Sequence, residues 1–264
     1  MNDLEYMPQN SRFEAVLLGF LGGALDVYCQ IQFDTLVATQ TGNILFLIAD
    51  ISHSSLHQTL IRLYSVLFFS LGFMFGLRVR AKAKTAFWRA YAILPLLVVT
   101  IVLPLLPYNR LLWVILLALG TGLLTLTFSG SQIESHAYSI LMTSGNYRKM
   151  ITAWHNYLTV EEKTAKIKRQ AVNYSLVVVS FIIGAIFVAI VHHFIQVRTI
   201  WVVSLTLAAI VYHYTSVVIR YRLQETRLEN PNVFYFNLSA NNLMSSGRVR
   251  QQPPTILAPS LCQT

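Results

Sequence analysis

The 264-residue chain is 55% hydrophobic and only 12% charged, with a mean hydropathy of +0.53. Soluble domains carry about 25% charged residues, so this composition excludes an ordinary soluble protein and indicates an integral membrane protein. The net charge of +9 does not indicate a nucleic-acid partner, because the basic residues cluster beside apolar segments, as they do in cytoplasmic loops that face anionic lipid.

The first helix is predicted from about Phe13 to Gln30 and contains one carboxylate, Asp26. A small-residue face suits close helix packing and consists of Gly19, Gly22, Gly23 and Ala24. A carboxylate inside a membrane span is costly and is by default a functional-site candidate. The alternative is that Asp26 lies near the helix end and caps the next segment, and the sequence leaves both interpretations open.

The following stretch, from Phe33 to Ile51, is apolar but polar at its centre, where it reads Gln40, Thr41, Gly42 and Asn43. Lipid cannot hydrogen-bond such side chains, so they must face protein or water. Because Gly-Asn can break a helix, we expect a broken segment that enters and leaves from the outside. A full crossing is the alternative.

Three further helices are predicted at Leu60–Leu77, Ala90–Leu106 and Leu111–Phe128. Arg62 lies near the outer end of its helix and is expected to extend to the headgroups. The basic cluster from Arg78 to Arg89 is expected to be cytoplasmic.

A second broken segment is predicted before the basic stretch from Arg148 to Arg169, which we expect to be a polar cytoplasmic loop. It repeats a hydroxyl residue, glycine and asparagine in the order of the first segment, as Thr143, Ser144, Gly145 and Asn146. Ahead of it, Glu134 and His136 are expected to be solvated. Helices are then predicted at Val172–Val191 and Thr199–Ile219.

These elements predict an all-α polytopic membrane protein with about six crossings and an internal N-terminus. The transmembrane domain covers residues 1–222 in two related halves, about 13–107 and 111–222, that face opposite ways as inverted repeats do. Residues 223–264 are expected to form a disordered cytoplasmic tail. Seven crossings, with the N-terminus outside, is the alternative.

Four motifs resemble the YoaK family of bacterial membrane proteins of unknown function: Asp26-Val27-Tyr28 with Gln40-Thr41-Gly42-Asn43-Ile44, Ser131-Gln132, Met142-Thr143-Ser144-Gly145-Asn146 and Phe181-Ile182-Ile183-Gly184-Ala185. The resemblance covers about Phe13 to Tyr221. It implies about six helices and a location in the bacterial cytoplasmic membrane, and it supplies no substrate.

The pair of broken segments favours a transporter or channel for a small solute or ion. The residues predicted to line the path are Asp26, Gln40, Thr41, Gly42, Asn43, Gln132, Thr143, Ser144, Gly145 and Asn146. The alternative for these residues is that they bond to one another and hold the helices together. The alternative functions are a membrane scaffold that recruits a cytoplasmic partner and, less favoured, a membrane enzyme.

No zinc-binding HExxH pair, GxSxG nucleophile turn or ATP-binding loop occurs in the sequence. We therefore expect no catalytic site, cofactor or metal. The glycine-rich faces are compatible both with a homo-oligomer and with packing inside one chain.

Overall fold

The computed structural model describes residues 8–53, 56–83, 85, 87–134, 136–141, 143–162 and 164–229. The chain divides into two units, Met1–Val218 and Ile219–Thr264, and the second is described only to Glu229, as the end of a helix. Of the tail expected from residue 223, the part up to Glu229 belongs to this helix, and the rest lies outside the described residues. All helices and strands that end before Val218 belong to the first unit.

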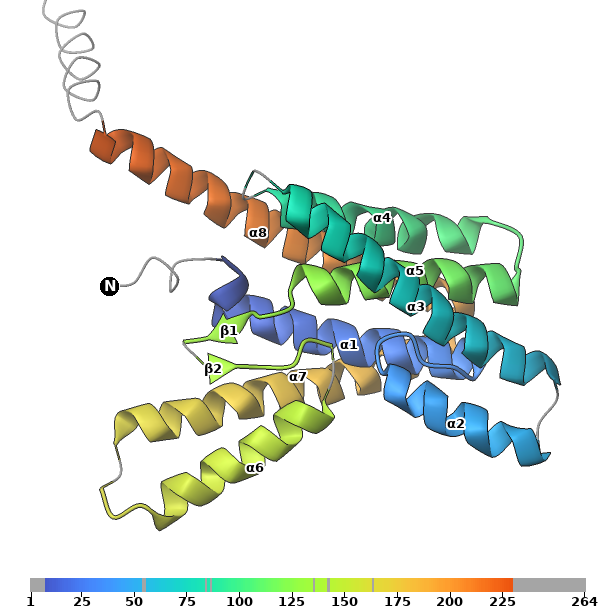
Figure 1. Ribbon diagram of the computed structural model, residues 1–264, viewed down its shortest axis with the longest axis horizontal. Coiled ribbons are helices and arrows are strands. Elements are labelled where there is room, and N and C mark those ends of the chain that lie inside the picture. Colours follow the sequence, from blue (N-terminus) through green and yellow to red (C-terminus); the bar gives the residue numbers. More distant parts are fainter. Residues whose placement is uncertain are drawn as a thin grey trace, which may run out of the picture. The chain divides into compact units, whose positions relative to one another are not determined.

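The described residues are mainly helical (Figure 1). The long helices are α1 (Arg12–Phe33), α3 (Leu56–Lys82), α4 (Trp88–Val102), α5 (Arg110–Thr127), α7 (Ala165–Ile195) and α8 (Ile200–Glu229). The shorter elements are η2 (Pro8–Asn10), α2 (Gln40–His53), η3 (Leu103–Leu105), β1 (Gln132–Ile133), β2 (His136–Ala137), α6 (Ser144–Thr159) and η4 (Gln196–Thr199).

Five ranges are long and apolar enough to cross a membrane: Arg12–Phe33, Leu56–Lys82, Trp88–Leu105, Arg110–Thr127 and Ala165–Tyr221. The last contains both α7 and most of α8. The all-α polytopic membrane fold expected from the sequence is therefore confirmed. In contrast, α2 has 14 residues and α6 has 16. At 1.5 Å per residue they extend about 21 and 24 Å, less than the hydrocarbon core of about 30 Å.

The long helices pack in two close pairs, α1 along α7 and α3 along α5 (Figure 1). Of the short helices, α2 packs on α3 and α6 packs on α7, while α4 packs on α5. The most buried spans are α1 and α5. The peripheral helices α3 and α7 expose large apolar side chains, which suits contact with lipid: Leu63, Leu67, Leu71, Met74, Phe75, Ile182, Ile183, Ile186, Phe187 and Ile190.

The α1–α7 pair touches backbone to backbone at two glycines. A Cβ atom at Gly23 would lie 2.0 Å from the carbonyl oxygen of Phe181, and one at Gly184 would lie 2.1 Å from that of Phe20. No other residue fits at this separation, which is why the first helix carries small residues on this face.

The structure corrects the expected polar loop from Arg148 to Arg169. Its first part belongs to α6, and its last part forms the first turn of α7, which begins at Ala165. A loop was predicted in place of α6 because polar residues outnumber apolar residues along this segment. Its apolar residues nevertheless recur at helical spacing.

Candidate functional site

The chain between α1 and α2 is irregular from Asp34 to Thr39. Asp34 caps α1 in the left-handed conformation, with φ 50°, and its N–H donates to the carbonyl of Gln30. The prediction that Gly42-Asn43 breaks the helix is wrong, since both residues lie in the first turn of α2. Gly42 instead lets the irregular segment approach that turn, because a Cβ there would lie 2.7 Å from Cδ1 of Leu36.

Asn43 is fully buried and holds the irregular segment to the start of α2. Its Oδ1 accepts from the N–H of Leu36 at 2.8 Å and from Thr35 Oγ1 at 3.1 Å. Its Nδ2 lies 2.6 Å from the carbonyl oxygen of Leu36, 2.9 Å from Gln40 Oε1 and 3.1 Å from Ser65 Oγ, so these three acceptors share its two protons. The hydrogen-bonding capacity of the amide is therefore fully used.

Asp26 binds the same segment from the α1 side. Its Oδ1 accepts from the backbone N–H groups of Val37, Ala38 and Thr39 at 3.1, 2.7 and 3.3 Å, and its Oδ2 accepts from Thr39 Oγ1 at 2.5 Å. Asp26 is 5% exposed. This is the capping arrangement that the sequence left open as an alternative, and it explains how a carboxylate is accommodated inside the protein.

The second irregular segment precedes α6, is described at residues 138–141 and 143, and is held in the same way. Asn146 is fully buried, accepts from the N–H of Ser139 at 2.8 Å and donates to its carbonyl at 2.6 Å. Each asparagine thus clamps the backbone of the residue seven positions before it. Leu141 has a left-handed φ of 56° and lies against Gly22, where a Cβ would be 2.7 Å from the Leu141 Cα.

The other predicted site residues are dispersed. Gln40 is buried and donates to the carbonyl of Val37, whereas Thr41 and Ser144 are exposed. Gln132 is exposed on β1, where its N–H donates to Asn10 Oδ1. Thr143 has a buried hydroxyl with no hydrogen-bond partner in the described structure.

An ion pair lies beside each break. Arg110, the first residue of α5, pairs with Asp34 at the end of α1 at 3.0 Å. Arg12, the first residue of α1, pairs with Glu134, which follows α5, at 3.0 Å. Because the start of each helix meets the end of the other, α1 and α5 run antiparallel.

Glu134 is not simply solvated, as the sequence suggested. Arg169 approaches its Oε1 at 2.6 Å and Asn173 donates to its Oε2 at 3.1 Å, in addition to the pair with Arg12. Partial burial raises the pKa of Glu134, but the hydrogen bonds from Asn173 and Arg169 and the charges of Arg12 and Arg169 outweigh it, so the pKa lies below the usual range.

Arg62 is also placed differently from the expectation. It turns inward instead of reaching headgroups, pairs with Asp50 and donates to the carbonyl of Asp34 at 3.1 Å. Its guanidinium lies 5.0 Å from the centre of the Phe46 ring. Arg62 therefore joins α3 to the start of the first break and to α2.

Two features of the buried polar structure escaped prediction from the sequence. Ser65 donates to the carbonyl of Leu36 at 2.7 Å, and Glu14, fully buried, lies 2.7 Å from His213 Nδ1. A serine among the large apolar residues of α3 and a glutamate inside the first span were the available signals. Among the described residues, no group of three or more His, Cys, Asp or Glu side chains is placed to hold a metal ion.

The profile of a family described as "Protein of unknown function (DUF1275)" matches residues 15–213. The chain belongs to this family. It is the YoaK family, to which the motifs at Asp26, Gln40–Ile44 and Met142–Asn146 pointed. No curated protein and no solved structure matched the chain.

Proposed function

We propose that this DUF1275 protein is a transporter or channel for a small polar solute or ion, built from two inverted halves. We assign it to the bacterial cytoplasmic membrane, and its multi-pass helices with basic loops on one side support that assignment. The antiparallel α1 and α5 are the first helices of the two halves, as an inverted repeat requires.

Helix packing supports the repeat residue by residue. In the α3–α5 pair, a Cβ at Gly122 would lie 2.1 Å from the carbonyl oxygen of Phe69, and one at Gly72 would lie 2.0 Å from that of Leu119. These distances reproduce those at Gly23 and Gly184 in the α1–α7 pair. The first helix of each half therefore crosses the third helix of the other half with the same contact.

The irregular segments support the repeat independently. The Asn43 clamp on Leu36 has its counterpart in the Asn146 clamp on Ser139. In the first half a cation on α3, Arg62, lies over an aromatic ring on α2. In the second half the roles are exchanged, because Lys149 on α6 lies 5.8 Å from the ring of Tyr174 on α7.

The observation that carries the proposal is the convergence of both irregular segments on one face of α1. Leu141 lies against Gly22, and Asp26, one turn later, binds Val37 to Thr39. Irregular backbone inside a membrane is tolerated only where protein or water covers it. In transporters built from inverted repeats, such paired segments bind the solute near the centre of the membrane. Thr41 and Ser144, exposed beside the two clamps, are the positions we assign to the path.

Cysteine accessibility tests this assignment. Cys262 would be replaced and the fully buried Cys29 retained, and single cysteines would be placed at Thr41 and Ser144. If the proposal is right, a membrane-impermeant thiol reagent labels Thr41→Cys from outside and Ser144→Cys from inside. Lack of labelling at both positions from either side contradicts it. Leu67→Cys, on the apolar face of α3, is the control for lipid-facing side chains, which the reagent does not reach.

Transport itself is tested in proteoliposomes. Osmotic swelling would be followed by light scattering with glycerol, glycine and potassium chloride in turn, for the wild type and for the labelled Thr41→Cys protein. Entry of a solute that stops on labelling supports a path beside the Asn43 clamp. Entry that continues unchanged in the fully labelled protein contradicts that location.

A further inference from the structure

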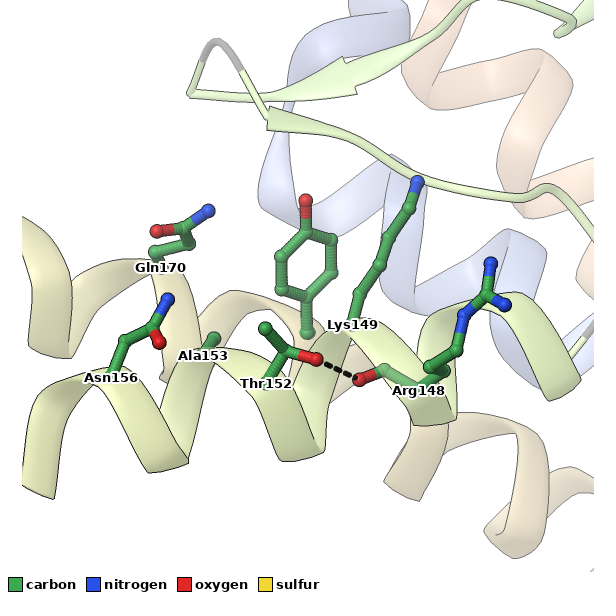
Figure 2. Close-up of a pocket in the computed structure, with 7 residues that line it drawn as sticks. Arg148, Lys149, Thr152, Ala153, Asn156 and Gln170 are labelled. Carbon is green, nitrogen blue, oxygen red and sulfur yellow. Dashed lines mark hydrogen bonds between the residues drawn. The ribbon is translucent and has the colours of Figure 1, made fainter.

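A cavity of about 200 Å³ lies between α6 and α7 (Figure 2). Arg148, Lys149, Thr152 and Asn156 line it from α6, and Gln170 and Tyr174 line it from α7. None of the lining side chains is acidic, so the cavity has two positive charges and several neutral hydrogen-bonding groups.

The two basic residues are held differently. Lys149 donates to the carbonyl of Ala137 at 2.8 Å, which fixes its position and leaves two of its three protons for another acceptor. Arg148 makes no ion pair within the part of the chain that the structure describes. A guanidinium of this kind is well suited to phosphate, because it presents parallel donors to two oxygens.

The outer surface of α6 indicates where the cavity lies relative to lipid. Tyr147, Ile151 and Leu158 are 51, 50 and 68% exposed and share one face of the helix. An apolar stripe beside basic residues on a short helix is typical of helices that lie in the membrane interface. Lys166 and Lys168, exposed at the start of α7, add positive charge nearby.

We propose that this cavity binds the phosphate group of an anionic phospholipid, with Arg148 and Lys149 as the charged contacts and the apolar stripe of α6 in the acyl region. The absence of a carboxylate from the lining favours a headgroup that carries net negative charge. A zwitterionic headgroup has an ammonium that would find no partner among these side chains. The proposal does not depend on transport.

Native mass spectrometry of the full chain, purified from micelles containing equal amounts of phosphatidylglycerol and phosphatidylcholine, tests the proposal. We expect the wild type to retain phosphatidylglycerol preferentially, and Arg148→Gln to lower that retention about fivefold. Arg78→Gln, which removes an exposed charge at the end of α3, is the matched control and should leave retention unchanged. An equal loss in both variants, or equal retention of both lipids by the wild type, overturns the proposal.

Two further arms separate the remaining outcomes. Gln170→Ala removes a contact from the α7 wall and should also weaken retention, which keeps the test valid if Arg148→Gln does not fold. Inorganic phosphate added at the lipid concentration should not displace phosphatidylglycerol, because it has no acyl chains to lie beside Tyr147 and Ile151. Displacement by inorganic phosphate would identify a site for the free anion and overturn the lipid assignment.

Discussion

At the scale of single residues, the two irregular segments show how polar groups are accommodated inside a membrane protein. At the first break, Asn43 is bonded to Leu36, Thr35, Gln40 and Ser65. The second clamp repeats the bonds to backbone, with Asn146 bonded to the N–H and the carbonyl of Ser139. The sequence identified both asparagines but not their backbone partners. A hydrogen bond to backbone atoms does not require a particular side chain, so the bonded residue cannot be recognised from its type.

The two clamps predict losses of stability. Asn43→Ala and Asn146→Ala should each lower the free energy of unfolding by about 2 kcal/mol or more, because each truncation removes the partner of a backbone N–H, that of Leu36 or that of Ser139. Thr41→Ala, an exposed residue of the same motif, should change it by less than about 0.5 kcal/mol. Thermal unfolding in detergent measures these effects, and a loss at either asparagine no larger than the loss at Thr41 would contradict the assigned bonds.

Glu134 predicts a dependence of stability on pH. Its pKa is lower in the folded chain than its ordinary value of 4.5, so its contribution is fully present above about pH 4.5 and is lost as the pH falls through the lower folded value. The wild type should therefore lose stability in acid more steeply than Glu134→Gln. Unfolding temperatures measured from pH 7 to pH 3 test this. Glu161→Gln, which alters an exposed carboxylate, is the control and should follow the wild type.

At the scale of elements, the sequence predicted the long helices well, because uninterrupted apolar runs are a strong signal. It misplaced the breaks. The sequence predicts that Gly42 and Gly145 break helices, whereas both lie in the first turn of a helix. Each allows the preceding segment to come close, because a Cβ would lie 2.7 Å from Leu36 Cδ1 at Gly42 and 2.9 Å from Ser139 Oγ at Gly145. A glycine has the same appearance in a sequence whether it supplies an unusual φ or a close approach.

The helix crossings give a prediction at this scale. Gly23→Ala and Gly122→Ala should each destabilise the protein by about 2 kcal/mol or more, because the added methyl would meet the carbonyl oxygens of Phe181 and Phe69, which belong to rigid helices. Gly145→Ala should cost less, since its methyl would meet only the terminal oxygen of Ser139. Unfolding in detergent ranks the three variants, and a larger loss at Gly145 than at Gly23 would contradict the backbone contact.

At the scale of the whole molecule, composition alone established a membrane protein, and the order of the basic segments suggested two halves. Contacts between the halves could not be predicted from the sequence, because the residues that form them are far apart along the chain. Arg12 is 122 positions from Glu134, and Arg110 is 76 positions from Asp34. Yet these pairs decide how α1 is directed. The start of α1 lies beside Glu134 and Arg169, at the end of the unit where α5 ends and α7 begins.

This arrangement predicts an internal N-terminus and six crossings. With Cys262 replaced, a cysteine at Asn2 should react with an impermeant thiol reagent only from inside, as Glu161→Cys does, while Tyr108→Cys reacts from outside. Seven crossings would leave the two reference positions unchanged and move only Asn2 to the outside, so the comparison separates the two topologies. If Asn2→Cys reacts from outside, as Tyr108→Cys does, α1 must run in the opposite direction. The ion pair of Arg12 with Glu134 does not permit that direction if α6, which follows Glu134, is cytoplasmic. Labelling of Asn2→Cys from outside would therefore contradict the arrangement.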